Sequence, residues 1–99
     1  MARNILKYVL QRGWQIPLEL PRNAQYLHLH QQNDIDVSLW FLVDTEEPAV
    51  TRYFTAVEAG GKAPPPAAKY LGSAHLQSGT FVVHVFEVAG GADVQYSLF

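Results

Sequence analysis

The sequence predicts an all-β fold: a single small antiparallel sandwich or barrel of six to seven strands, with at most one short helical turn. Apolar and polar residues alternate with a period of two, and β-branched and aromatic residues are common. Nowhere does an apolar pattern at helical spacing persist for three turns. The 99 residues form one domain, long enough to bury a core without disulfides or metal ions.

The predicted strands follow one another with short turns between them. They cover residues 5–10, 14–20, 25–31, 37–43, 51–58, 71–77 and 80–88. The last two strands are joined by Ser78-Gly79, whose glycine admits the positive φ of a tight hairpin turn. In the predicted register of this hairpin, His75 lies opposite Val82.

One face of strand 14–20 is apolar and should point into the core. It comprises Trp14, Ile16, Leu18 and Leu20. Pro17 cannot donate a hydrogen bond to a neighbouring strand, so this strand should lie at a sheet edge or carry a bulge. In strand 25–31, alternation places Leu27 and Leu29 on one face, and Tyr26, His28 and His30 on the other.

Two strands contain continuous apolar runs, over residues 39–43 and 81–86. A run of this kind is typical of a strand buried on both faces, so both strands should be central, or, for residues 39–43, the strand should lie under a partner. The stretch 59–66 ends in three prolines, which lack N–H donors; it should be a surface loop, with one helical turn at 67–70.

We expect residues 1–89 to form the β domain and residues 90–99 to form a strand-like tail after a Gly90-Gly91 hinge. The tail could pack on its own domain, exchange with a neighbouring copy or fray. The seven Lys and Arg residues are scattered along the chain and are outnumbered by nine Asp and Glu residues, which does not favour nucleic-acid binding. With no apolar stretch near 20 residues and no signal-like start, we expect no membrane partner and no secretion.

No catalytic constellation is visible, so we expect no enzyme and no cofactor. Cysteine is absent, and the serines lie outside any nucleophile-elbow context. His28 and His30 share a strand face and could ligate a metal, but no third ligand is placed by the sequence, and a solvated polar face is the simpler interpretation. His84, which neighbours His75 across the hairpin, is most simply a core histidine with one hydrogen-bond partner.

Five short motifs occur in a characteristic order and spacing. They are Lys7-Tyr8, Ile16-Pro17-Leu18, the run from Leu39 to Asp44, Tyr70-Leu71-Gly72, and the run from Gly79 to Glu87. Over residues 5–88 the chain thereby resembles a family of small uncharacterised proteins of tailed bacteriophages, a domain of unknown function. The resemblance implies a phage accessory protein in the host bacterial cytoplasm, and it assigns no activity to any residue. The stretch 59–66 replaces a glycine-rich turn expected there.

These observations favour a non-enzymatic phage protein that binds and inhibits a host component, most simply in counter-defence. The aromatic residues least needed for the core, Trp14, Tyr96 and Phe99, are candidate contacts for a host protein. A homodimer or higher homo-oligomer is the expected assembly, formed through the two apolar strands or the tail, because twofold homodimers are the commonest soluble oligomers.

Three alternatives stay open. A homo-oligomeric sponge would sequester a small nucleotide signal, with a tryptophan or tyrosine stacked on the base and Arg52 or Lys62 contacting the phosphate. A virion structural protein would use the tail for assembly. A histidine-dependent metalloenzyme would need bound metal in stoichiometric amount.

Overall fold

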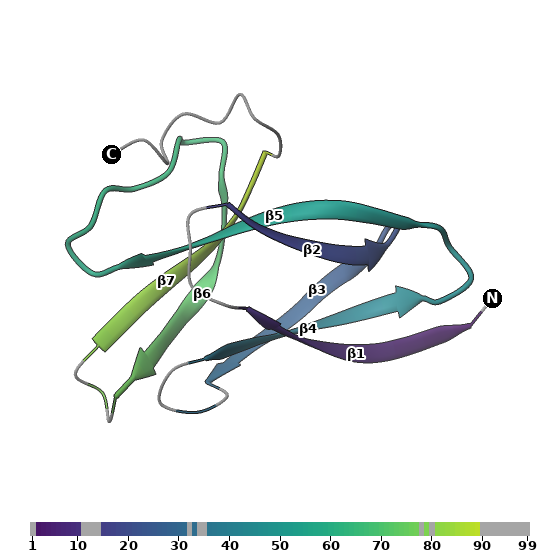
Figure 1. Ribbon diagram of the computed structural model, residues 1–99, viewed down its shortest axis with the longest axis horizontal. Coiled ribbons are helices and arrows are strands. Elements are labelled where there is room, and N and C mark those ends of the chain that lie inside the picture. The colour runs from purple at the N-terminus through teal and green to yellow at the C-terminus, as the bar shows by residue number, and fades with distance from the viewer. Residues whose placement is uncertain are drawn as a thin grey trace.

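Two antiparallel sheets packed face to face make up the computed structural model of the protein (Figure 1). The structure describes residues 2–10, 15–31, 33, 36–77, 79 and 81–89. Its strands are β1 (Arg3–Leu10), β2 (Ile16–Pro21), β3 (Gln25–Gln31), β4 (Val37–Asp44), β5 (Ala49–Glu58), β6 (Lys69–Leu76) and β7 (Phe81–Val88). The three-stranded sheet has the order β1-β4-β3, and the four-stranded sheet has the order β2-β5-β7-β6. The predicted all-β fold is confirmed, and the described residues contain no helix.

The core fills the space between the two sheets, with Phe41 of β4 at its centre. Its ring meets that of Phe54, on β5, in a T-shaped arrangement with centroids 6.1 Å apart. The rings of Tyr8 and Tyr26 each approach Phe41 with centroids 5.8 Å away. Both phenylalanines are fully buried. Aromatic pairs in this geometry add to the stabilisation from area burial, so this cluster anchors one sheet to the other.

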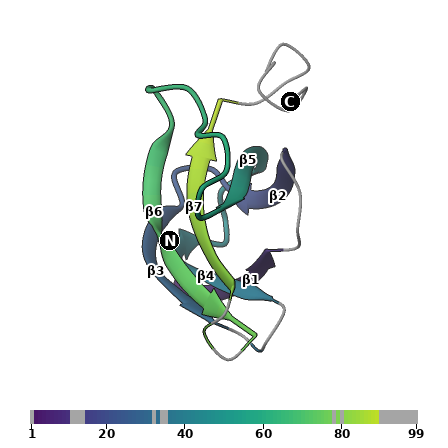
Figure 2. The same ribbon diagram turned by 90° about the vertical axis from the view of Figure 1, so that its left-hand side faces the viewer.

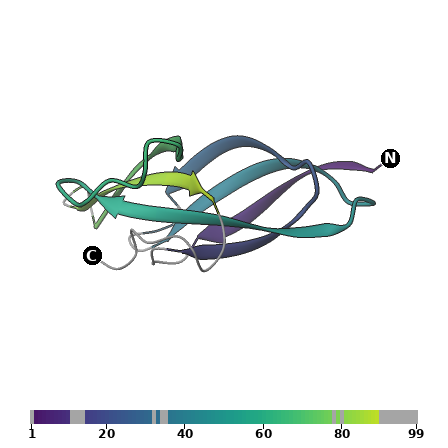
Figure 3. The same ribbon diagram turned by 90° about the horizontal axis from the view of Figure 1, so that it is seen from above.

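The longest strand, β5, gives the four-stranded sheet a stagger. It has ten residues and runs along most of the length of the molecule (Figure 3). Residues 49–54 pair with β2, whereas residues 53–58 pair with β7. The two neighbours of β5 therefore overlap only near its middle.

The two sheets meet along one side, where β3 lies beside β6 (Figure 2). There the hydroxyl of Tyr26 donates a hydrogen bond to the backbone carbonyl of Leu71 at 2.9 Å. Both strands are irregular at this place, with a register shift between Tyr26 and His28 in β3 and another between Tyr70 and Gly72 in β6. On the opposite side, β1 and β2 are the edge strands of their sheets.

The predicted alternation of β3 is wrong in its first half. The bulge places Tyr26 opposite Phe41 and His28 opposite Trp40, with Leu27 as the extra residue. Tyr26 therefore packs against the core, while the side chain of Leu27 is 41% exposed. Beyond the bulge, Leu29 packs inward as predicted. A bulge adds one residue to a strand and so reverses the sense of alternation on one side of it.

Two local predictions are confirmed. Pro17 lies on β2, which is an edge strand, where a residue without an N–H donor is tolerated. In the hairpin of β6 and β7, His75 does lie opposite Val82, and Gly79 has a positive φ of 88°. The paired register of this hairpin ends at Leu76 and Phe81.

The apolar runs do mark interior strands, because β4 lies between β1 and β3, and β7 lies between β5 and β6. Within a single chain, residues 39–43 are not fully buried on both faces. Leu39, Phe41 and Val43 are buried, but the alternate residues Trp40 and Leu42 are only half-buried. The three-stranded sheet therefore has a partly apolar outer side.

The helical turn predicted at 67–70 is also wrong. The amide of Ala68 donates to the carbonyl of Pro65 at 2.9 Å, which closes a single turn. Strand β6 begins immediately afterwards, at Lys69, where pairing with Glu87 of β7 starts. Sheet pairing from Lys69 onward thus ends the turn before a helix can form, as tertiary context often overrides local propensity.

Candidate functional site

The outer face of the three-stranded sheet is the surface most unlike an ordinary solvated sheet. Because Leu6, Tyr8, Leu39 and Phe41 pack into the core, the alternate residues of β1 and β4 point the other way. The cross-strand register then arranges this outer face in three rows. They are Ile5–Leu42–Gln25, Lys7–Trp40–His28 and Val9–Ser38–His30. Below, "outer face" means these nine residues, of which Ser38 is buried.

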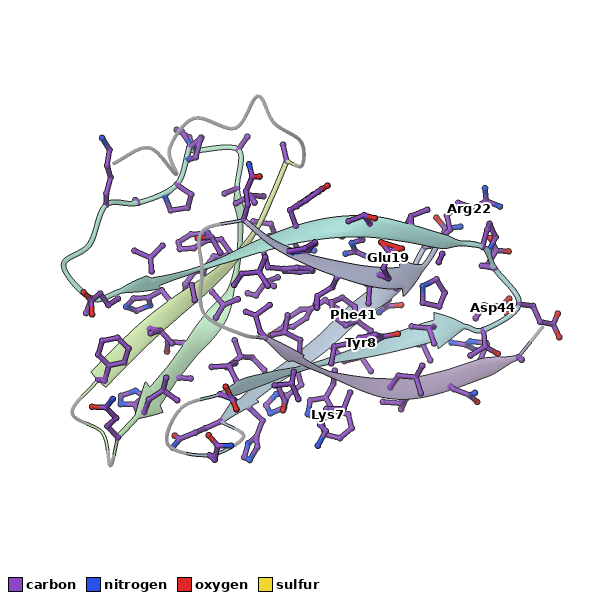
Figure 4. All side chains as sticks on the ribbon, viewed as in Figure 1. Lys7, Tyr8, Glu19, Arg22, Phe41 and Asp44 are labelled. Atoms are coloured by element: carbon purple, nitrogen blue, oxygen red, sulfur yellow. The ribbon has the colours of Figure 1, made fainter. Side chains whose placement is uncertain are left out.

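Apolar residues occupy four of the outward positions on β1 and β4. The side chain of Ile5 is 60% exposed and that of Val9 is 40% exposed, while Trp40 and Leu42 are half-buried. Figure 4 shows Tyr8 and Phe41 between the sheets and Lys7 on the other side of β1. An antiparallel sheet with one solvated face usually alternates apolar inward with polar outward. Here the outward positions break that alternation, which is typical of an interaction surface.

Positive or neutral polar groups surround Trp40 on this face. Lys7 and His28 flank Trp40 in the same row, and His30 lies in the next row. None of the nine residues is acidic. The polar groups of the outer face are therefore basic or neutral.

Asp44 lies just beyond the outer face, opposite Arg3 at the end of β4. Its Oδ1 atom accepts hydrogen bonds from the backbone amides of Glu46, at 3.0 Å, and Ala2, at 3.1 Å. These two hydrogen bonds lower the pKa of the Asp44 carboxyl, because they favour its charged form. The carboxylate thus ties the start of β1 to the turn after β4.

The imidazoles of His28 and His30 stack, with ring centroids 6.3 Å apart, and both side chains are exposed. They form the pair on one strand face that the sequence predicts. Within the described ranges there is no group of three or more His, Cys, Asp or Glu residues placed to hold a metal ion. The pair supplies two ligands, whereas a structural or catalytic zinc site takes at least three from the protein.

Arg52, a candidate phosphate contact, is engaged inside the protein. Its Nε atom lies 2.6 Å from one carboxylate oxygen of Glu87, and a terminal nitrogen donates to the other at 2.8 Å. The second terminal nitrogen donates to the carbonyl of Ala24 at 2.6 Å, and the guanidinium lies 5.4 Å from the ring centroid of Phe41. A bidentate pair of this kind is strong and directional. To bind a phosphate, Arg52 would first have to leave Glu87.

Of the other predicted binding residues, the structure describes only Lys62. Lys62 is exposed in the connection between β5 and β6. Trp14, Tyr96 and Phe99 lie outside the described residues, as does the tail 90–99. The outer face is not among the predicted binding residues, although the sequence left open that residues 39–43 lie under a partner. The sequence does contain an indication of this face. On β1, Ile5 and Val9 lie on one face and Leu6 and Tyr8 on the other, so both faces of the strand carry apolar side chains.

A second aromatic group lies on the outer side of the four-stranded sheet. The hydroxyl of Tyr70 is hydrogen-bonded to Nδ1 of His84 at 3.0 Å, and its ring meets Phe86 with centroids 5.2 Å apart. His84 is only half-buried, so its interpretation as a core histidine is wrong, although it does have a hydrogen-bond partner. It points outward because Val83 and Val85 take the inward positions of β7.

Fold and site together define a small two-sheet β domain with one partly apolar, cation-bearing sheet face. A family model described as a domain of unknown function, DUF7352, matches residues 1–95, and the chain belongs to this family. No curated protein and no solved structure matches the chain. The described part of the chain has no helix able to cross a membrane.

Proposed function

We propose that this protein is a non-enzymatic binding protein that blocks a host protein by covering part of its surface with the outer face. The observation that carries the proposal is the exposure of Ile5 and Val9 beside half-buried Trp40 and Leu42. Interface centres are enriched in aromatic residues and poor in charge, which fits a centre at Trp40 and Leu42.

The polar groups around Trp40 indicate the chemistry of the partner. Lys7, His28 and His30 would face carboxylates that border an apolar patch on the host protein. Electrostatic complementarity of this kind raises the association rate and suppresses wrong partners. The motif resemblance to small phage proteins supports a bacterial host component as target, with counter-defence as the setting.

The nucleotide sponge has less support, because Glu87 and the carbonyl of Ala24 already occupy the guanidinium of Arg52. A virion structural role rests on the tail alone, which lies outside the described residues. Neither alternative has an observation in its favour that the host-protein binder lacks.

The test compares the wild-type protein with a double variant, Ile5→Glu with Lys7→Glu, as bait in bacterial lysate. The matched control is His75→Glu, an exposed residue of β6 on the other sheet. A protein captured by the wild type is identified and purified, and its Kd for each form is measured by titration calorimetry.

We expect the Kd of the double variant to rise at least tenfold, because it places carboxylates where the partner's carboxylates would lie. The control should bind like the wild type, and added salt should weaken wild-type binding. Equal Kd values for the wild type and the double variant would contradict the proposal, and so would a lysate in which no specific partner is captured.

A further inference from the structure

We infer that two copies of this chain pair through the free edge of β1, in antiparallel orientation about a twofold axis, to make one continuous six-stranded sheet. This inference does not rest on the proposed function. It follows from a comparison of the four strand edges that the two sheets present.

Three of the four edges carry features that prevent pairing with another strand. Strand β2 contains Pro17 and Pro21, which cannot donate hydrogen bonds. Strands β3 and β6 each contain a bulge, and they lie beside one another, joined by the hydrogen bond from Tyr26 to Leu71. Natural sheets protect their edges with prolines, bulges and covering segments of this kind.

Strand β1 has none of these features. Its eight residues pair one-to-one with β4, from Arg3 opposite Asp44 to Leu10 opposite Val37, with no bulge and no proline. Among the described residues, no strand pairs with its other edge. A straight edge of this length offers a row of backbone N–H and C=O groups, which is a template for a further strand.

Both faces of β1 suit pairing with a second copy. In twofold antiparallel pairing, outward residues meet outward residues and inward residues meet inward residues. Ile5 and Val9 would then extend the apolar outer face, while Leu6 and Tyr8 would extend the inner one. A foreign strand would have to supply apolar residues on both of its faces, whereas a second copy supplies them by symmetry.

Lys7 determines which register is favourable. A twofold axis at Lys7 would set two ammonium groups directly opposite one another, which is destabilising. An axis at Leu6 instead sets Ile5 opposite Lys7 of the partner subunit and still overlaps residues 3–9. Ile5, the most exposed large apolar side chain of the described residues, would gain cover from that lysine's aliphatic stem.

The test uses the lack of cysteine in the chain, because any introduced cysteine is then unique. Light scattering on the full chain should give twice the monomer mass of 11.1 kDa, falling only on dilution. Under mild oxidation, Leu6→Cys should cross-link to itself, because residues at a twofold axis have Cα atoms about 4.5–5.5 Å apart. Leu42→Cys is the matched control on β4, whose two copies would lie about 16 Å apart, three strand spacings across and two residues along the strands.

A second variant is needed because Leu6→Cys also removes a core contact of Leu6 and could destabilise the fold. Ile5→Lys with Val9→Lys adds like charges along β1 on the outward face only, and it should convert the dimer to a monomer of unchanged circular dichroism. A monomeric wild type overturns the inference. A dimer that cross-links at Leu42→Cys but not at Leu6→Cys also overturns it. A dimer that is lost only when the chain is truncated after Ala89 does so too. None of these readouts involves a host protein, so failure here is separate from failure of the proposed function.

Discussion

Tyr26 connects the two sheets on the side where β3 meets β6. Its ring packs edge-to-face on Phe41, and its hydroxyl reaches the carbonyl of Leu71, 45 residues further along the chain. Alternation within β3 predicts this side chain on the polar face, together with His28. The error arises because a bulge depends on pairing with β4 and leaves no sign in the local sequence.

We predict that Tyr26→Phe lowers the free energy of unfolding by about 1–2 kcal/mol, because the ring contacts stay and the part-buried carbonyl of Leu71 loses its donor. Urea denaturation followed by fluorescence measures the change. Tyr70→Phe is the control: its hydroxyl meets His84 at an exposed site, and its effect should be smaller. A larger loss in Tyr70→Phe would show that the bridge between the sheets is not the stronger contact.

Arg52 shows why ligand-binding residues are hard to assign from sequence alone. An arginine in a strand looks available for a phosphate until its partner is known. That partner, Glu87, lies 35 residues away and is brought alongside only by the pairing of β5 with β7. The function of the side chain therefore depends on sheet order, which local patterns do not reveal.

At the level of elements, the sequence predicts the strands well because their signal is local. All seven predicted strands are present, and β3 has the predicted bounds. Alternation and turn residues mark where a strand begins and ends. Pairing between strands distant in sequence is not local information, so neither the strand order of the two sheets nor the contact between β3 and β6 could be predicted.

Gly72 marks the bulge of β6, with a φ of 149° that residues with a Cβ rarely adopt. An added Cβ would meet Leu29 at an ordinary 3.7 Å, so the cost of a substitution lies in the backbone. We predict that Gly72→Ala destabilises the protein by about 1–2 kcal/mol. Ser73→Ala, the next and exposed position, should change stability by less than about 0.5 kcal/mol. Thermal unfolding of both variants by calorimetry tests this, and equal Tm values would refute the role of the glycine.

At the scale of the whole molecule, stability should decline at both ends of the pH range. The folded state lowers the pKa of Asp44, so its contribution is present above the unfolded value of 3.8 and is lost as the pH falls through the folded value. Burial raises the pKa of Tyr8 and Tyr26 above 10.0, so their contribution is present below 10.0 and is lost as the pH rises through the folded values.

Urea unfolding at a series of pH values should therefore give a plateau between these limits. Asp44→Asn should reduce the pH dependence of the free energy of unfolding on the acid side only. Tyr8→Phe should reduce it on the alkaline side only. An acid side unchanged by Asp44→Asn would mean that other carboxyl groups control it.

The pairing of β1 with β4 also bears on how the chain is made. The amide of Ala2 bonds to Asp44, 42 residues further on. A ribosome adds about 5–20 residues per second, so β1 waits on the order of a few seconds before β4 has been synthesised. During that interval both of its edges and both of its apolar faces have no native partner. Until β4 has been synthesised, the nascent β1 segment is thus the part of the chain that most needs a chaperone, or that most readily contacts another nascent copy on the same messenger RNA.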